Sequence, residues 1–206
     1  MTAQPPSTAA QPSVLATTQE KSDRIYGGRP FEPTNISLSL LHPVFGEFRD
    51  STKTIEPSAK DNNAVLELTE MMLKFYKKEK ERETEFHKFF VSYFGVQLHT
   101  GSINGTSSGS DGHGFPIPNS PHSLIHVITE IKNELAGNNT DPYFQVAFLY
   151  RDYLKTFPSG TFSHTSFPVM VVLVFGKYQN AQSASSKTDL IRTTHRVLPA
   201  DCGHAG

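Results

Sequence analysis

The stretch LIHVITEIKNELAGNNTDPYFQVAFLYRDYL, residues 124–154, decides the fold. Its first part, 124–131, is mostly apolar and β-branched toward its end, which predicts a strand at the centre of a sheet. Gly137 begins a turn after this strand. Asp141 and Pro142 then match the cap and the first position of an amphipathic helix.

A second apolar run, FPVMVVLVF at 167–175, predicts a strand that is covered on both faces. Because a helix separates the two runs, we expect a crossover that joins parallel neighbouring strands. Upstream, apolar residues recur at helical spacing over 61–94, with Asp61 as the N-cap and Gly95 as the end. The sequence therefore predicts an α/β domain over 26–176, with a small mixed β-sheet flanked by helices.

Three segments differ from this domain in composition. Residues 1–25 are rich in Thr, Ala, Gln, Pro and Ser, and residues 177–206 are polar and aperiodic. Such segments bury too little apolar surface to offset the entropy of ordering, so we expect a disordered leader and a disordered tail. Residues 101–114 are rich in Gly, Ser, Thr and Asn and are expected to form a flexible connection. The sheet is then expected to be incomplete at one edge.

Composition limits the function classes. The chain has 206 residues, with 19 Lys and Arg against 20 Asp and Glu, so no overall basic field draws it to nucleic acid, although a local basic patch stays open. The single cysteine, Cys202, excludes an intramolecular disulfide and a zinc site built on cysteines. We expect an intracellular protein, cytoplasmic or nuclear and without a membrane partner, because no leader peptide and no apolar run of about 18 residues is visible.

The candidate chemistry lies at the end of the first predicted strand. Glu130 and Lys132 are two residues apart, so their side chains leave the same face of the strand. Mg²⁺ prefers oxygen ligands and keeps several waters, so Glu130, the carbonyl of Ile131 and one more carboxylate would suffice, with Mn²⁺ as a substitute. Asp111, ahead of a Pro-rich segment that would turn a hairpin, is the second carboxylate. Lys132 would orient the attacking water.

Simpler interpretations compete with this one. A glutamate and a lysine two residues apart are common by chance and usually mark a solvated strand face or a local ion pair. His113, His122 and His126 match no standard zinc spacing, which favours unrelated surface histidines. The chain has no phosphate-binding glycine motif and neither the His-Arg-Asp nor the Asp-Phe-Gly triplet of kinases, so we expect no nucleotide cofactor and no kinase activity in this chain.

Four motifs together resemble a known superfamily. They are HPVFGEF at 42–48, SDG at 110–112, EIKNEL at 130–135, and DP at 141–142 followed by Gln145. The chain resembles the PD-(D/E)xK nuclease-like superfamily. More narrowly, over 26–176 it looks like the domain that precedes the kinase-like domain in fungal-type protein kinase proteins.

The resemblance implies a restriction-endonuclease-like core. It implies Asp111 and Glu130 as metal carboxylates, Lys132 as the catalytic lysine, and Gln145 with Tyr150 as a supporting motif on the next helix. In related folds an acidic residue on the first helix can join the metal site; Glu47 is the candidate here, although a solvated glutamate is the simpler interpretation.

The chain also departs from the family pattern. Ser110 replaces the usual proline before the aspartate, residues 115–122 are inserted in the hairpin, and no kinase-like domain follows, which suggests a truncated copy. Two functions therefore stay open. The first is Mg²⁺-dependent hydrolysis of phosphodiester bonds in nucleic acid. The second is a non-catalytic regulatory or binding module that keeps the nuclease architecture.

Overall fold

The structure is a computed structural model that describes residues 4–20, 43–103, 108–115, 124–133, 140–158, 169–175 and 192–196. A five-stranded sheet forms its centre, with strands in the order β1-β2-β3-β4-β5. The strands are β1 (His99–Ser102), β2 (Gly109–Gly114), β3 (Val127–Lys132), β4 (Val169–Phe175) and β5 (Arg192–Arg196). Only the β3–β4 pair is parallel, and the other three pairs are antiparallel. The sheet is therefore mixed, as predicted.

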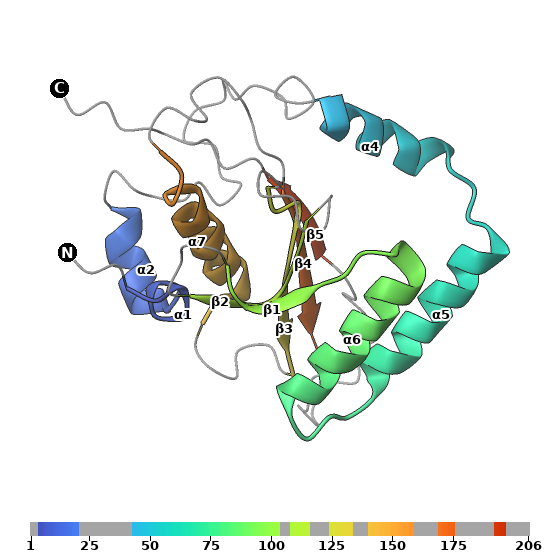
Figure 1. Cartoon of the computed structure of the whole chain (residues 1–206), viewed down its shortest axis with the longest axis horizontal. Coiled ribbons are helices and arrows are strands. Elements are labelled where there is room, and N and C mark those ends of the chain that lie inside the picture. Colours follow the sequence, from blue (N-terminus) through green and yellow to red (C-terminus); the bar gives the residue numbers. More distant parts are fainter. Residues whose placement is uncertain are drawn as a thin grey trace.

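Helices cover the two faces of this sheet (Figure 1). On one face, α5 (Ala59–Leu73) and α6 (Glu79–Phe94) lie side by side, and their buried side chains pack against Val127 and Ile131 of β3. On the other face, α7 (Pro142–Leu154) packs against Ile128. Alternate residues of a strand point to opposite faces, which explains why neighbours on β3 belong to different clusters. The predicted α/β class, a small mixed sheet flanked by helices, is confirmed.

The central β3–α7–β4 unit follows its local sequence signals. Asp141 caps α7, because its Oδ1 accepts hydrogen bonds from the backbone N–H of Tyr143 at 2.9 Å and of Phe144 at 3.3 Å. Pro142 takes the first helical position, where a missing N–H costs nothing. Strand β4 then returns parallel to β3, with Glu130 paired to Leu173. The predicted cap, helix and parallel return are confirmed.

The single helix predicted over 61–94 is instead two helices. Ser58 is the N-cap of α5, and Asp61 completes a capping box from the third position, accepting from the Ser58 N–H at 2.7 Å. Residues 74–78 interrupt the helix before α6 begins. Gly95 ends α6 in the left-handed region at φ 70°, as predicted.

The N-terminal segment differs from its prediction. Helices α1 (Pro6–Ala9) and α2 (Pro12–Gln19) occupy part of the leader that was expected to be disordered. Ala9 and Ala10 are buried in one cluster with Ala147 and Phe148 of α7. The small alanine side chains allow this segment to approach α7 closely. The composition of the segment alone could not predict this contact, because it depends on Phe148 of a distant helix.

Two further segments also form strands. Part of the connection expected over 101–114 is β2, which pairs with β1 on one side and β3 on the other. The predicted tail contributes β5, which pairs with β4 and supplies the edge that was expected to be missing. Ahead of α5, the residues of the HPVFGEF motif from Pro43 onward begin the helix α4 (Pro43–Thr54). Among the residues that the structure describes, no helix is long and apolar enough to cross a membrane.

Candidate active site

Strand pairing brings the predicted site residues to one end of β2 and β3. The two strands are antiparallel, with Gly112 paired to Thr129. Asp111 precedes Gly112 on β2 and Glu130 follows Thr129 on β3, so the two carboxylates come to the same end of the sheet, with Glu130 on the face of β3 opposite to that of Thr129. Lys132 ends β3 two residues beyond Glu130 and shares that face.

The ammonium group of Lys132 lies among three carboxylates. Its Nζ is 2.7 Å from Oε1 of Glu130, 3.4 Å from Oε1 of Glu79 and 3.9 Å from Oδ2 of Asp111. Asp111 is further fixed by the backbone N–H of Ile131, which donates to its Oδ2 at 2.8 Å. The structure therefore brings Asp111, Glu130 and Lys132 together, and it adds Glu79.

Glu130 is the most buried charged group of the site. Its residue is 1 % exposed, and within the described ranges neither side-chain oxygen has a partner in hydrogen-bonding geometry, although Lys132 is close. Burial raises the pKa of Glu130 to about 7, and the Asp111 carboxylate adds to the rise while Lys132 opposes it. A buried carboxylate with unsatisfied oxygens is costly, which makes this group a candidate for binding a cation.

The neighbouring groups respond to the same environment. Burial raises the pKa of Asp111, while the Ile131 N–H and Lys132 lower it. Burial lowers the pKa of Lys132, but the carboxylates of Glu130, Asp111 and Glu79 outweigh this effect, so the pKa lies above its ordinary value. Lys132 therefore stays charged at neutral pH and holds the carboxylates together.

A bulge in β2 sets the position of Asp111. His99 pairs with His113 and Gly101 with Ser110, so two steps along β1 face three steps along β2. The extra residue lies between Ser110 and His113, in the part of β2 that carries Asp111, and an irregularity of this kind changes the direction of nearby side chains. The buried Ser110 and His113 brace the bulge, with Oγ and Nδ1 2.9 Å apart.

Gly112 is required beside Asp111 because α6 approaches it closely. A Cβ at this position would lie 2.8 Å from Nε2 of His87 and would overlap Oγ1 of Thr129. The glycine thus lets the helix and the bulged strand come into contact. A glycine stands at position 112 because its neighbours leave no room for a Cβ, and not because the backbone turns there.

Sequence reasoning missed the acidic side chains of α6. Glu79 reaches Lys132 from the first position of the helix, and the buried Glu83 accepts from Oγ1 of Thr100 at 2.8 Å and pairs with Lys80 at 2.5 Å. Both lie in the run KKEKERETE, 77–85, which resembles a solvated charged face. The helical period alone shows that Glu79 and Glu83 share one face. Glu47, the acidic residue considered from sequence, is exposed on α4.

The supporting residues predicted on α7 make no hydrogen bond to Asp111, Glu130 or Lys132 in the described part of the chain. The Gln145 side chain is half-buried. Tyr150 is 1 % exposed and packs in the core between α7 and the sheet, where burial raises the pKa of its hydroxyl. A catalytic contribution of Gln145 stays a prediction.

The donor set fits a hard divalent cation only in part. Across the described ranges no group of three or more His, Cys, Asp or Glu side chains is arranged to hold a metal ion. Two carboxylates suffice for Mg²⁺, which keeps several of its waters, and the buried Oε2 of Glu130 has no partner among the described residues. Ile131 contacts Asp111 through its N–H, and its carbonyl stays a predicted ligand. Comparison of the chain with family models, curated proteins and solved structures finds no match.

Proposed function

We propose that this protein is a metal-dependent phosphodiesterase that hydrolyses nucleic acid. The observation that carries the proposal is the meeting of Asp111, Glu130 and Lys132 at one end of β2 and β3, where both Glu130 oxygens are buried and Oε1 contacts only the Lys132 ammonium among the described residues. A sheet that holds two carboxylates and a lysine on one face is also what the resemblance to PD-(D/E)xK nucleases implies. A nucleic-acid substrate would place the protein in the cytoplasm or the nucleus.

The residues divide the chemistry among them. Asp111 and Glu130 would hold Mg²⁺ or Mn²⁺, which supplies a water of lowered pKa and neutralises charge on the phosphate. Lys132 stands beside both carboxylates and would orient the attacking water and stabilise negative charge that develops on the phosphoryl oxygens. Glu79 holds Lys132 from the side of α6. The N–H of Ile131 fixes the Asp111 carboxylate in place.

One observation favours a second candidate, a non-catalytic binding or regulatory module. Lys132 already neutralises Glu130 at 2.7 Å, so the site carries its own cation. In that case the pair is an ordinary ion pair at a strand end, and the fold has been kept without the chemistry. The two candidates differ in whether added metal has any effect on the protein.

A cleavage assay separates them. Purified protein would be incubated with labelled single-stranded DNA, double-stranded DNA and RNA, each with Mg²⁺, Mn²⁺ or EDTA. We expect cleavage only with metal. Lys132→Ala and Glu130→Ala should each abolish it, because one loses the group that orients water and the other loses a ligand. Gln145→Ala should reduce cleavage less.

Lys60→Ala, on the distant end of α5, is the matched control for loss of a lysine and should cleave like wild type. Thermal unfolding of each variant excludes loss of the fold as the cause. Failure of the wild type to cut any of the three substrates would favour the non-catalytic module. Equal cleavage by wild type and Lys132→Ala would assign the activity to another site or to a contaminant.

A further inference from the structure

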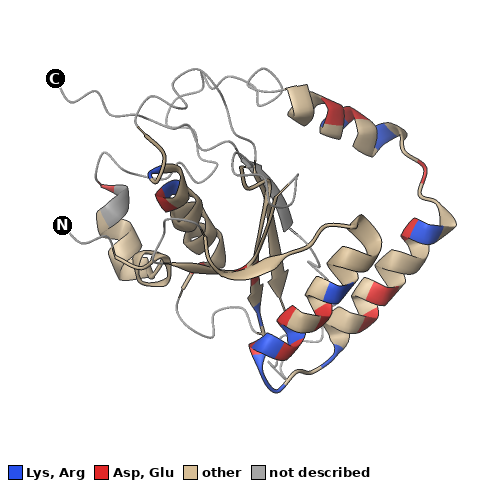
Figure 2. Cartoon of the chain, viewed as in Figure 1, with Lys and Arg blue, Asp and Glu red and all other residues tan. Residues whose placement is uncertain are grey.

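The turn between α5 and α6 is basic and aromatic, with the sequence KFYKK at 74–78. We call these five residues the basic turn. Phe75 is 70 % exposed, more than any other large apolar side chain that the structure describes. Figure 2 shows basic residues in the turn at this end of the two helices, followed by basic and acidic residues that alternate along the start of α6. The basic turn therefore combines an exposed aromatic ring with positive charge on both sides of it.

Buried and part-buried hydrogen bonds hold the basic turn beside the candidate active site. The guanidinium of Arg82 donates to the carbonyls of Met72 and Lys74, each at 3.1 Å, and to Oδ1 of Asn133 at 3.0 Å. Asn133 in turn donates to the carbonyl of Tyr76 at 3.4 Å, and the Arg82 guanidinium stacks 4.6 Å from the Tyr76 ring. Because Asn133 directly follows Lys132, these hydrogen bonds join the turn to the strand that carries the site.

The first residue of α6 makes a second link. Glu79 directly follows the basic turn, and its Oε1 lies 3.4 Å from Nζ of Lys132. A polymer that lies across the turn therefore passes the site. This continuity distinguishes the basic turn from the other exposed apolar side chains, such as Phe94 at the far end of α6.

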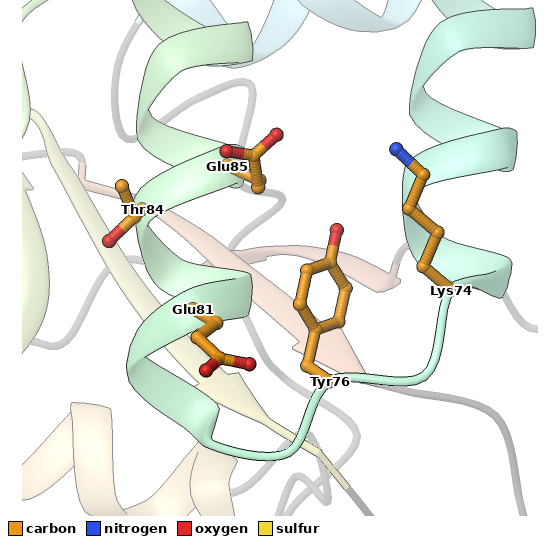
Figure 3. A pocket seen from close by; sticks show the side chains of 5 residues that line it. All are labelled: Lys74, Tyr76, Glu81, Thr84 and Glu85. Carbon is orange, nitrogen blue, oxygen red and sulfur yellow. The ribbon is translucent and has the colours of Figure 1, made fainter.

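The hollow behind the turn is not the binding surface. It has a volume of about 410 Å³, and Glu81 and Glu85 of α6 line it together with Lys74, Tyr76 and Thr84 (Figure 3). Carboxylates on its wall repel an anion. The charge available to an anion lies outside it, on Lys77 and Lys78, which are exposed and have no ion-pair partner among the described residues.

We propose that the basic turn binds a single strand of nucleic acid and guides it to the site. Lys77 and Lys78 contact the phosphates, and one unpaired base stacks on Phe75. A single strand fits better than a duplex because an exposed aromatic ring can only stack on a base that is free of its neighbours. The choice of nucleic acid rests on the proposed function, but binding is measured without cleavage and so is tested separately.

The test measures fluorescence anisotropy of labelled oligo-dT and oligo-U with the full chain in EDTA, which prevents any metal-dependent cut. We expect the double variant Lys77→Ala/Lys78→Ala to bind at least about tenfold more weakly at 50 mM salt. For the same double variant, the slope of log K against log salt concentration should be smaller in magnitude by about 1.4. This value is the sum for two lysines, each of which contributes about 0.7 on a single strand. Phe75→Ala should weaken binding by about 5- to 150-fold, the range for loss of one stacked base.

Matched controls remove the same groups elsewhere. Lys53→Ala/Lys60→Ala changes the net charge equally on α4 and α5, and Phe94→Ala removes another exposed aromatic; both should bind almost as wild type does. The proposal is overturned if the wild type binds no single-stranded oligonucleotide. It is also overturned if each basic-turn variant binds with the same affinity as its control variant. Equal affinity for a duplex, or binding to vesicles with anionic lipid in place of oligonucleotide, would also overturn it. Strand binding without any cleavage would support the basic turn and reject only the enzyme.

Discussion

Lys132 and Glu130 form an ion pair of 2.7 Å in which the carboxylate side chain is 1 % exposed and the lysine side chain is 17 % exposed. The cost of removing charge from water therefore falls mainly on Glu130. One lysine shared among three carboxylates does not fully offset that cost, since the pKa of Glu130 is raised to about 7. This imbalance leads to a direct prediction about stability.

Without metal, the protein should lose stability as pH rises. Because the pKa of Glu130 is about 7 in the folded state and its ordinary value is 4.5, the folded state binds the proton more tightly. Its contribution to the free energy of unfolding is full below pH 4.5 and is lost as pH rises through about 7. Glu130→Gln, which stays neutral, should be more stable than wild type at pH 8 by about 1 to 3 kcal/mol and similar at pH 4.5.

Urea unfolding in EDTA at the two pH values measures this difference. Asp111→Asn, whose carboxyl is also raised in pKa by burial, should show the same sign. A Glu130→Gln variant that is less stable than wild type at pH 8 would mean that the pair with Lys132 stabilises the fold by more than burial of the carboxylate costs.

Arg82→Lys should destabilise the protein by about 2 to 4 kcal/mol, because an ammonium group cannot reach three acceptors in one plane. Arg82 is 2 % exposed and joins the carbonyls of Met72 and Lys74 to Asn133. Arg49→Lys, on the exposed face of α4, is the control and should change the free energy of unfolding little. Chemical denaturation of the two variants gives the comparison, and equal effects would exclude a structural role for the Arg82 hydrogen bonds.

Gly112→Ala should cost about 1 to 3 kcal/mol, because the new methyl group meets His87 of α6 and Thr129 of β3. The cost should fall when His87 is also alanine, since one of the two contacts is then removed. A double-mutant cycle by thermal unfolding measures this coupling. Additive effects of Gly112→Ala and His87→Ala would show that the helix does not pack against the glycine as the structure has it.

Glu79→Gln should reduce cleavage while changing stability by less than about 1 kcal/mol, because its pair with Lys132 is part exposed. The loss of rate should be smaller than for Lys132→Ala, since Glu79 acts by holding the lysine. Glu67→Gln, exposed on α5, is the control and should leave the rate unchanged. Single-turnover rates for the three variants test this order, and a Glu79→Gln rate equal to that of wild type would exclude the residue from the site.

The strongest local signals predicted the fold around β3 and α7 correctly. A continuous apolar run, an Asp-Pro helix start and a second apolar run leave little choice of arrangement, so the parallel β3–β4 pair followed. The break between α5 and α6 was not visible, because KFYKK contains no glycine or proline. Arg82 stabilises the break, because its long side chain donates hydrogen bonds to the carbonyls at the end of α5.

Part of the site was visible for the same reason. The two-residue period of a strand places Glu130 and Lys132 on one face. Asp111 could be placed beside them because its strand, β2, forms a hairpin with the next strand in the chain, β3. Glu79 was missed because its approach to Lys132 depends on how α6 crosses the sheet, which no local pattern encodes. Gln145 was predicted from the family resemblance, but the rotation of α7 against the sheet decides where its side chain lies.

The measurement that tests the central claim most directly is isothermal titration of Mn²⁺ and Mg²⁺ into wild type, Asp111→Asn, Glu130→Gln and Lys132→Ala. If Asp111 and Glu130 hold the catalytic cation, wild type binds one ion per chain, and Lys132→Ala binds at least as tightly because a competing positive charge is gone. Asp111→Asn and Glu130→Gln then lose the binding. No heat of binding in wild type, or equal binding by wild type and both carboxylate variants, would contradict the account.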